Sequence, residues 1–357
     1  MSVPYIAAAG LQLGVMVHQH ELLVDFGEPY DLPRTLGVLQ RGQGDPAVQV
    51  DRGSFGSGPA GTPGAGAWIC RRVYSGTGEE LGQVTYRLHQ VSASAVRVRT
   101  AATSESLAVT AAHQAHGLLG GEDDWTELEL LLNGLGGRIS KTLAEVRRRH
   151  PGVRLPATGA LFDQLVVATL EQKVTHQQAR HTWRHLLRRH GQQPPGFPNS
   201  SAPEGMRLPL SAAQLRHVPS WQWHQMWVQP QLAKTVLRVA ERAAAVHRLG
   251  VATPLETRRV GELSEQLTAV PGIGRWTTAE ALQRSHGAAD LPAVGDFHLA
   301  HFVGEALTGR RTDDAGMLEL LEPFRPHRQR IIRLLKLSGF RNQRFGPRLA
   351  PEDHRRR

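Results

Sequence analysis

The chain is poor in cysteine, with Cys70 as the only one among 357 residues. A single thiol cannot close a disulfide within the chain, and it cannot supply a zinc knuckle or the thiolates of an iron–sulfur cluster. The sequence therefore excludes a disulfide framework and a cysteine-ligated cluster within one chain. It is consistent with a reducing cytoplasm.

Long apolar runs are also missing. The most apolar part of the N-terminus, residues 3–17, is interrupted by glycine and glutamine, has no basic residue before it, and is shorter than a membrane span. We interpret it as an extension or a first strand, and the role of residues 1–25 stays open. We expect a soluble, cytoplasmic protein with no membrane partner.

Positive charge is concentrated in one part of the chain, whose formal net charge is +10. Residues 1–120 carry 8 Lys and Arg against 9 Asp and Glu, whereas residues 121–357 carry 34 against 23. This asymmetry predicts a polyanionic partner for the second part. The alternative, a charge that serves solubility alone, does not account for it.

The apolar periodicity changes near residue 120. Apolar and polar residues alternate over 84–88 and 96–98, and Trp68-Ile69-Cys70 is typical of another strand. From Asp124 onward the period is helical. We predict an α+β fold, mainly α. Its parts are a β-rich N-terminal domain (1–120), an all-helical domain (121–345) and a basic tail (346–357).

Residues 263–298 contain the most informative signals. An amphipathic run leads to Pro-Gly-Ile-Gly at 271–274, a helical run covers 275–286, and Gly295-Asp296 follow. Glycine permits positive φ and a close approach of the backbone to a ligand. The first amides of the second helix lack helical partners and lie at the positive end of its dipole. The pattern favours a phosphate-binding turn, and the alternative is a corner that only packs two helices.

Residues 267–298 resemble the helix-hairpin-helix–Gly/Pro/Asp superfamily of DNA glycosylases. The separation of Trp276 from Asp296, together with the blocks at 161–175 and 324–328, resembles the alkylated-base branch, 3-methyladenine DNA glycosylase II. The resemblance implies a small antiparallel-sheet domain before a helical core, with the helix-hairpin-helix at 261–286. The single cysteine excludes the branches that carry an iron–sulfur cluster.

The function that the resemblance implies is base excision repair on double-stranded DNA containing damaged bases. A monomeric, nucleoid-associated, monofunctional glycosylase would flip out an alkylated, 3-methyladenine-like base and hydrolyse its N-glycosidic bond, leaving an abasic site. One alternative is a glycosylase for a deaminated or oxidised base. Another is a non-catalytic, structure-specific DNA-binding protein.

Asp296 matches the superfamily's essential aspartate. Its carboxylate would stabilise the developing oxocarbenium charge or orient the attacking water, and it could also cap the helix that follows. Bifunctional relatives carry a Schiff-base lysine where this chain has Trp276. Because tryptophan cannot be that nucleophile, we expect no lyase activity.

The resemblance places four side chains in the base pocket: Trp276, Phe162, Glu280 and His298. Glu280 and Lys336 stand where the branch commonly carries aromatic residues, and Lys173 stands where it commonly carries an apolar wedge. These departures predict a more polar pocket. The preferred lesion and the identity of the intercalating residue stay open.

The predicted DNA contacts come from the glycine turn, the loop before residue 176 and one face of the helix after it. They are Gly272, Ile273, Gly274, Arg275, Thr277, Gln172, Lys173, Arg180 and Arg184. For the two arginines on the helix, a solvated basic stripe is the alternative. The resemblance implies a structural Na or K ion at the backbone carbonyls of Thr268, Val270 and Ile273. We expect no other cofactor.

Overall fold

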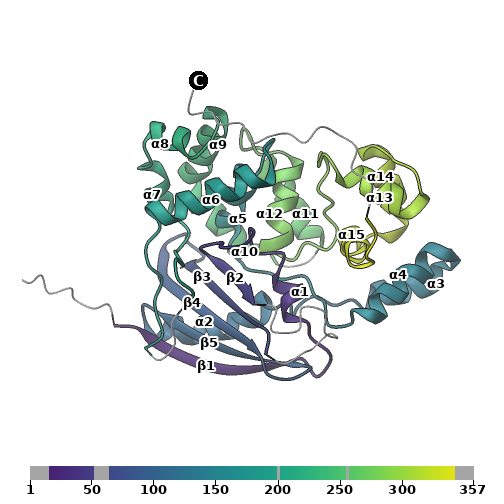
Figure 1. Cartoon of the computed structure of the whole chain (residues 1–357), viewed down its shortest axis with the longest axis horizontal. Coiled ribbons are helices and arrows are strands. Elements are labelled where there is room, and N and C mark those ends of the chain that lie inside the picture. Colours follow the sequence, from purple (N-terminus) through teal and green to yellow (C-terminus); the bar gives the residue numbers. More distant parts are fainter. Residues whose placement is uncertain (1–15, 52–63, 199–201, 255–256, 342–357) are drawn as a thin grey trace, which may run out of the picture.

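The computed structural model describes residues 16–51, 64–198, 202–254 and 257–341. The predicted basic tail (346–357) and most of residues 1–25 that precede the first strand lie outside this part. The described residues form one antiparallel sheet and a larger set of helices (Figure 1). The predicted α+β class is confirmed, and the proposed domain boundaries stay predictions.

The sheet has five strands in the order β1-β5-β4-β3-β2, and each neighbouring pair is antiparallel. The strands are β1 (His18–Asp25), β2 (Val48–Asp51), β3 (Gly66–Tyr74), β4 (Glu80–Gln90) and β5 (Ala95–Ala102). The alternating residues at 84–88 and 96–98 lie in β4 and β5, and Trp68 to Cys70 lie in β3, as predicted.

The alternation sends successive side chains of β4 to opposite faces of the sheet. Val84, Tyr86 and Leu88 are buried in the core shared with helix α2 (Glu105–Leu118). On the other face, the hydroxyl of Thr85 donates to the carbonyl of Pro195 at 2.6 Å. The sheet therefore packs between α2 and the extended segment that follows helix α6 (His176–His190).

Two helices inside residues 1–120 differ from the β-rich prediction. Helix α1 (Leu32–Leu36) is capped by Asp31, whose side chain accepts from the Arg34 amide. Helix α2 is capped by Ser104 and buries mainly alanines. A short helix and an alanine-rich face give a weak apolar period, so the sequence pattern did not predict them.

The rest of the described chain is helical. The remaining helices are α3 (Thr126–Leu135), α4 (Gly137–Arg149), α5 (Leu161–Leu170), α6, α7 (Ala212–Arg216), α8 (Ser220–Gln225), α9 (Pro230–Glu241), α10 (Ala243–Ala252), α11 (Thr257–Thr268), α12 (Arg275–Ser285), α13 (Leu299–Thr308), α14 (Asp314–Leu321), the 3-10 helix η1 (Glu322–Phe324) and α15 (Arg328–Leu337).

One helix break was not apparent in the sequence pattern. The run 124–150 divides into α3 and α4 because Gly136 and Gly137 both have positive φ. Helix α13 begins shortly after Asp296, where the capping alternative placed a helix. The helices pack into two apolar cores: α5, α6, α9 and α12 build one, and α3, α4 and α13 to α15 build the other. The segment from the glycine turn to α12 joins both cores.

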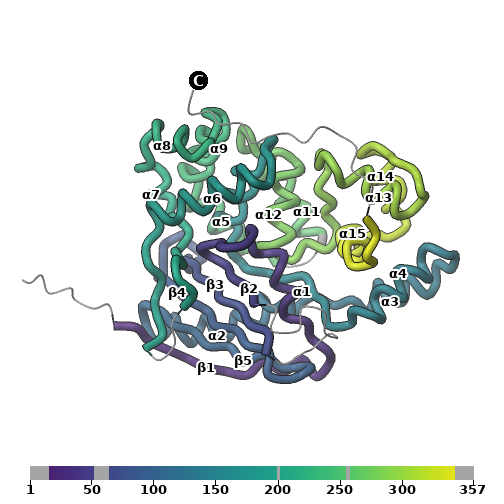
Figure 2. The backbone as a smooth tube through the Cα atoms, viewed as in Figure 1, coloured from purple at the N-terminus to yellow at the C-terminus, as the bar shows by residue number. Residues whose placement is uncertain are grey.

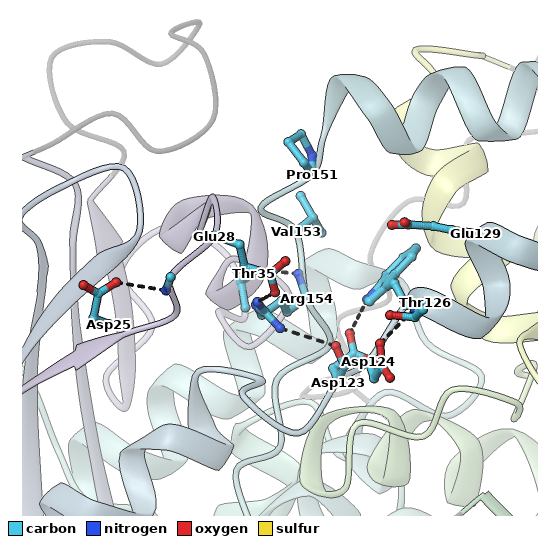
Figure 3. A network of polar contacts seen from close by, with 12 residues as sticks. Asp25, Glu28, Thr35, Asp123, Asp124, Thr126, Glu129, Pro151, Val153 and Arg154 are labelled. Carbon is cyan, nitrogen blue, oxygen red and sulfur yellow. Dashed lines mark hydrogen bonds and ion pairs between the residues drawn. The ribbon is translucent and has the colours of Figure 1, made fainter.

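Polar contacts fix the sheet region to the helices. The Arg154 backbone N–H donates to the Thr35 hydroxyl at 3.2 Å, and its guanidinium pairs with Glu28 and reaches the Asp123 carbonyl (Figure 3). The chain between α1 and β2 therefore runs beside the helical part, as the purple trace in Figure 2 shows. No helix of the described residues is long and apolar enough to span a membrane.

Candidate active site

The glycine turn joins α11 to α12 as predicted. Gly272 has φ +95°, and a Cβ built there would lie 2.4 Å from the Thr235 hydroxyl oxygen of α9. Only glycine fits this position without rearrangement. Gly274 differs from the prediction because its φ of −108° and ψ of 179° are extended backbone. Its missing side chain leaves open space instead, since a Cβ there would meet no described atom within 4 Å.

The start of α12 presents unpaired amides. Its first bond to the turn runs from the Thr278 amide to the Gly274 carbonyl at 3.0 Å, and no described residue accepts from the amides of Arg275 to Thr277. Arg275 is exposed beside them. The Ile273 side chain is buried in the core. Ile273 can therefore offer DNA only its backbone.

The loop between α5 and α6 is tied to the turn. The Gln172 amide nitrogen donates to the Gly272 carbonyl at 2.9 Å and to the Thr277 hydroxyl at 2.7 Å. Thr277 is buried, so its side chain braces the loop rather than reaching outward. Lys173 follows at the exposed tip with φ +52°, a conformation that L side chains rarely adopt.

Both carboxylate oxygens of Asp296 accept hydrogen bonds. Oδ1 accepts from the backbone amides of His298 and Leu299, each at 2.9 Å, and Oδ2 accepts from the Trp276 indole at 3.3 Å. The predicted capping role is confirmed, because these amides open α13. Asp296 is only partly buried. The carboxylate is thus oriented by the fold and stays within reach of a ligand at the surface.

Phe297 is a surface aromatic that the sequence analysis did not single out. Its side chain is 83% exposed directly after Asp296, and its ring lies 4.8 Å from that of His298. Such exposure is unusual for a phenylalanine, which normally lies inside.

Trp276, Glu280 and Arg284 recur every fourth residue and therefore share one face of α12. Glu280 pairs with Arg284 at 2.8 Å, and the Arg284 Nε donates to the Val38 carbonyl at 3.0 Å. Burial by itself would raise the pKa of the Glu280 carboxyl. Arg284 and two further cations outweigh burial and hold that pKa below its usual value.

Lys336 of α15 is one of those two cations. The helix is anchored by a buried pair in which both carboxylate oxygens of Asp290 accept from Arg328 at 2.8 Å. Lys336 is in contact with solvent, yet burial lowers the pKa of its ammonium against the opposing charges of Glu280 and Asp296.

Arg41 is the other cation, and it comes from the sheet region. Its side chain is 10% exposed, it pairs with Glu171 at 3.2 Å, and its charge acts on Glu280. Its Nη2 is buried and has no hydrogen-bond partner among the described residues. We call Arg41, Glu280 and Lys336 the charged wall. Sequence analysis did not identify Arg41, because no local pattern links residue 41 to residue 280.

Two predicted pocket residues have different surroundings. Phe162 is 1% exposed in the core, with its ring 5.0 Å from that of His247, so contact with a base would require the core to open. His298 is exposed next to Phe297. A role in the pocket stays a prediction for both.

The two arginines of α6 face the loop before β2. Arg184 donates to the Gln43 carbonyl at 3.4 Å, and the Arg180 side chain packs against Gly42. Both retain exposed or partly exposed side chains. A packing role accounts for their position, and DNA contact stays a prediction.

Two of the three carbonyls predicted to hold a monovalent ion are available at the turn, and the ion itself stays a prediction. The Val270 carbonyl accepts from the Ile273 amide at 2.9 Å, whereas the carbonyls of Thr268 and Ile273 receive no backbone hydrogen bond within the described chain. Carbonyl oxygens are ligands for hard cations. No cluster of three His, Cys, Asp or Glu side chains that could hold a metal occurs among the described residues.

An open depression of about 600 Å³ lies elsewhere, over α4, and is lined by Arg138, Lys141 and Arg148 among others. Figure 1 shows α4 at the edge of the molecule, away from α11 and α12. It contains no aspartate and has no contact with the glycine turn. We therefore assign the candidate site to Asp296 and its surroundings.

No protein-family model matches this sequence, and comparison with curated proteins gives no match. Solved structures do match. A 3-methyladenine DNA-glycosylase from Archaeoglobus fulgidus has TM-score 0.65 and 15% identity, with 89% of this chain and 98% of that chain covered. MBOgg1 in complex with a low-affinity DNA ligand has TM-score 0.60 and 12% identity, with 91% and 98% covered.

The apo form of an 8-oxoguanine glycosylase/lyase from Clostridium acetobutylicum has TM-score 0.59 and 10% identity, with 91% of this chain and 99% of that chain covered. The chain therefore has the fold of DNA glycosylases, as the resemblance implied. The fold is common to structures named for different bases, so it does not by itself determine the base.

Proposed function

We propose that the protein is a monofunctional DNA glycosylase of base excision repair that acts, as a monomer, on alkylated purines in double-stranded DNA. The arrangement of Asp296 carries this proposal. Its carboxylate accepts from the indole of Trp276, the second residue of α12, and no described residue accepts from the amides of Arg275 to Thr277 at the start of that helix. A protein that only binds DNA has no use for an oriented carboxylate so close to a phosphate-binding turn.

The first step is the capture of the DNA backbone. The amides of Arg275 to Thr277 and the positive end of the α12 dipole would bind a phosphate. Carbonyls of Thr268, Val270 and Ile273 would hold a Na or K ion that neutralises phosphate charge. The ion would be structural, and no step of the reaction depends on it.

With the backbone held, the damaged nucleotide would leave the stack and place its sugar near Asp296. As the glycosidic bond breaks, positive charge develops on the sugar. The carboxylate would stabilise that charge and orient the attacking water. Two unit charges about 4 Å apart in an effective dielectric near 20 interact by about 4 kcal/mol, which corresponds to about three decades in rate.

Trp276 would contribute to the choice of base. Its ring is partly buried and its indole N–H is bonded to Asp296, so its orientation is fixed. An electron-rich ring attracts a cationic base by a cation–π interaction of about 0.5–2 kcal/mol. An alkylated purine carries such a charge and departs readily without a dedicated general acid.

We also propose that the enzyme lacks lyase activity. The chain contains only four lysines: Lys141, Lys173, Lys234 and Lys336. Trp276 stands where bifunctional relatives carry the Schiff-base lysine, so borohydride should trap no covalent complex with DNA. Among the four lysines, Lys336 is the one on which the charge of Asp296 acts. Trapping that disappears in Lys336→Met would overturn this part and make Lys336 the Schiff-base nucleophile.

The central test is release of bases from duplexes that contain single lesions, scored with and without alkali. Wild-type protein should release alkylated purines and leave alkali-labile sites. Asp296→Asn should retain DNA binding and lose about three decades in rate. The matched control is Asp313→Asn, which makes the same change of carboxylate to amide at the residue that caps α14. Full turnover by Asp296→Asn would remove Asp296 from the mechanism.

A second candidate substrate class is favoured by a specific observation. The charged wall replaces an apolar surface beside Trp276, and such a surface suits an uncharged, hydrogen-bonding base as well as a cationic one. A deaminated or oxidised purine is therefore the alternative substrate, and the same panel of duplexes distinguishes it.

A further inference from the structure

The charged wall combines two cationic donors, Arg41 and Lys336, with one carboxylate acceptor, Glu280. Glu280 binds Arg284 through Oε2, and no described residue donates to its Oε1. No carboxylate in the described residues lies within 4.0 Å of the Lys336 ammonium, and Arg41 Nη2 is buried without a partner. Buried polar groups are nearly always hydrogen-bonded, so an unpartnered one indicates a missing ligand or water.

A phosphate does not suit this surface. Lys336 and Arg41 would attract it, but the charge of Glu280 acts on both of them and the charge of Asp296 also acts on Lys336. Two carboxylates would repel a dianion at short range. A neutral or singly charged group with both donors and acceptors fits the mixed charges better.

Glu280, the acceptor of the charged wall, lies on the same face of α12 as Trp276, one helical turn beyond it. A base that leaves the duplex toward Asp296 and stacks on the indole ring would turn its outer edge toward Glu280. Enzymes that flip bases read them by stacking and by hydrogen bonds to the Watson–Crick edge. The wall is placed to do the second while Trp276 does the first.

We infer that the charged wall selects flipped purines that carry a 6-carbonyl group and a hydrogen on N1. This inference rests on the proposed glycosylase function and narrows its substrate class. Hypoxanthine and 7-methylguanine have this pattern, and 3-methyladenine does not. The site thereby accepts one alkylated base and one deaminated base, because both present the same hydrogen-bonding edge.

The chemistry of the two edges explains the selection. A carboxylate only accepts hydrogen bonds, so Glu280 matches the N1–H of a 6-oxopurine. Ammonium and guanidinium groups only donate, so Lys336 and Arg41 match the 6-carbonyl. An adenine-type base presents an amino group instead of the carbonyl and carries no N1–H. Its edge would leave the Glu280 oxygen and the two cations unpaired, which disfavours it.

The test compares two bases from one substrate. DNA treated with a methylating agent contains both 7-methylguanine and 3-methyladenine, and the rates of their release give a ratio for each variant. Glu280→Gln keeps the shape of the side chain but adds a donor. It should lower the release of 7-methylguanine relative to 3-methyladenine by about 10- to 100-fold. A hypoxanthine duplex should show the same loss.

The matched control is Glu241→Gln at the end of α9, where an exposed carboxylate pairs only with Arg242. Its ratio should stay within about twofold of wild type. Lys336→Met provides a second variant, because the solvent-exposed end of that side chain is removable without opening the core. It should also lower the ratio and the hypoxanthine rate.

The outcomes separate the two proposals. A wild-type enzyme that releases bases at a ratio unchanged in Glu280→Gln and Lys336→Met overturns the inference and leaves the glycosylase function in place. Absence of release from every lesion by the wild-type protein overturns the glycosylase function itself. Loss of all activity in Glu280→Gln with an unchanged ratio in Lys336→Met assigns Glu280 to structure and also overturns the inference.

Discussion

The glycine turn and the charged wall lie next to each other and are built in opposite ways. The turn is made from backbone, within eleven residues from Thr268 to Thr278, and its key position is a glycine with positive φ. The wall is made from side chains of residues 41, 280 and 336, which come from the sheet region, α12 and α15.

The difference shows how recognition is divided. Backbone amides can hold any phosphate, and they serve every DNA sequence equally. A choice between bases requires donors and acceptors at particular positions, which side chains supply. We therefore expect changes in the turn to alter DNA affinity for all substrates, and changes in the wall to alter the ratio between substrates.

The largest effect on stability is expected from Arg328→Met, which breaks the anchor of α15 and with it the wall. Removing one partner of a buried ion pair leaves Asp290 unpaired and should lower the free energy of unfolding by about 3–5 kcal/mol. Urea denaturation measures this. Arg325→Met, three residues earlier and in an exposed pair with Glu322, should lose less than about 1 kcal/mol. Equal losses would contradict the anchoring role.

A smaller effect is expected from Gly272→Ala, which acts on the turn. An alanine there would have to adopt a positive φ, and its Cβ would lie 2.4 Å from the Thr235 hydroxyl oxygen. The variant should therefore lose about 1–3 kcal/mol of stability and bind all DNA, damaged or not, more weakly. Fluorescence anisotropy and thermal unfolding measure the two effects.

Gly274→Ala is the matched control for this prediction. Its backbone is extended and a Cβ would meet no described atom, so the fold should tolerate it. Any loss of affinity in Gly274→Ala would then report the close approach of DNA to the turn. A Gly272→Ala protein with normal stability would contradict the geometry of the turn.

Lys173→Ala should change the salt dependence more than the affinity. If Lys173 contacts one phosphate, the slope of log K against log salt should fall by about one. Arg97→Ala in β5, where the arginine pairs with Glu21, lies in the sheet and should leave the slope unchanged. A slope that is the same in both variants would assign Lys173 to the loop conformation alone.

A final prediction concerns the dependence of stability on pH, through the buried groups His247 and Asp163. Burial lowers the pKa of His247 to about 4. The unfolded chain therefore takes up a proton first, and stability falls as pH decreases from about 6.5 to 4. His247→Gln should remove this part of the loss of stability at acid pH. Urea denaturation at several pH values measures it.

Asp163 provides the control of opposite sign. Burial raises the pKa of its carboxyl from 3.8 to about 7. The contribution of Asp163 to stability is therefore fully present below pH 3.8 and is lost as the pH rises to about 7. Asp163→Asn should be more stable than wild type at pH 8. A wild-type pH profile in both variants would contradict the burial of these groups.

The sequence predicted the turn well because its signals are local. Gly272, the unpaired amides of α12 and Asp296 all follow from glycine, helix and capping rules that act within a few residues. The strands at β3 to β5 were predicted for the same reason. Helices α1 and α2 were missed because a short segment or an alanine-rich face has little apolar periodicity.

The surroundings of several site residues depended on packing. Thr277 is buried and braces Gln172, and Phe162 lies in the core beside His247. Both follow from the side of a helix that faces its neighbour. A motif match names the residue type at a position but does not state which direction the side chain takes.

By itself, the sequence determined the turn that can hold a phosphate, the aspartate after it and the excess of positive charge in the helical part. Only the tertiary structure decided that Arg41 and Lys336 meet Glu280 beside Trp276. Local rules act over a few residues along the chain, whereas the electrostatic interactions of the wall act through space between segments nearly 300 residues apart. A base is recognised by such a surface, and it exists only once the chain has folded.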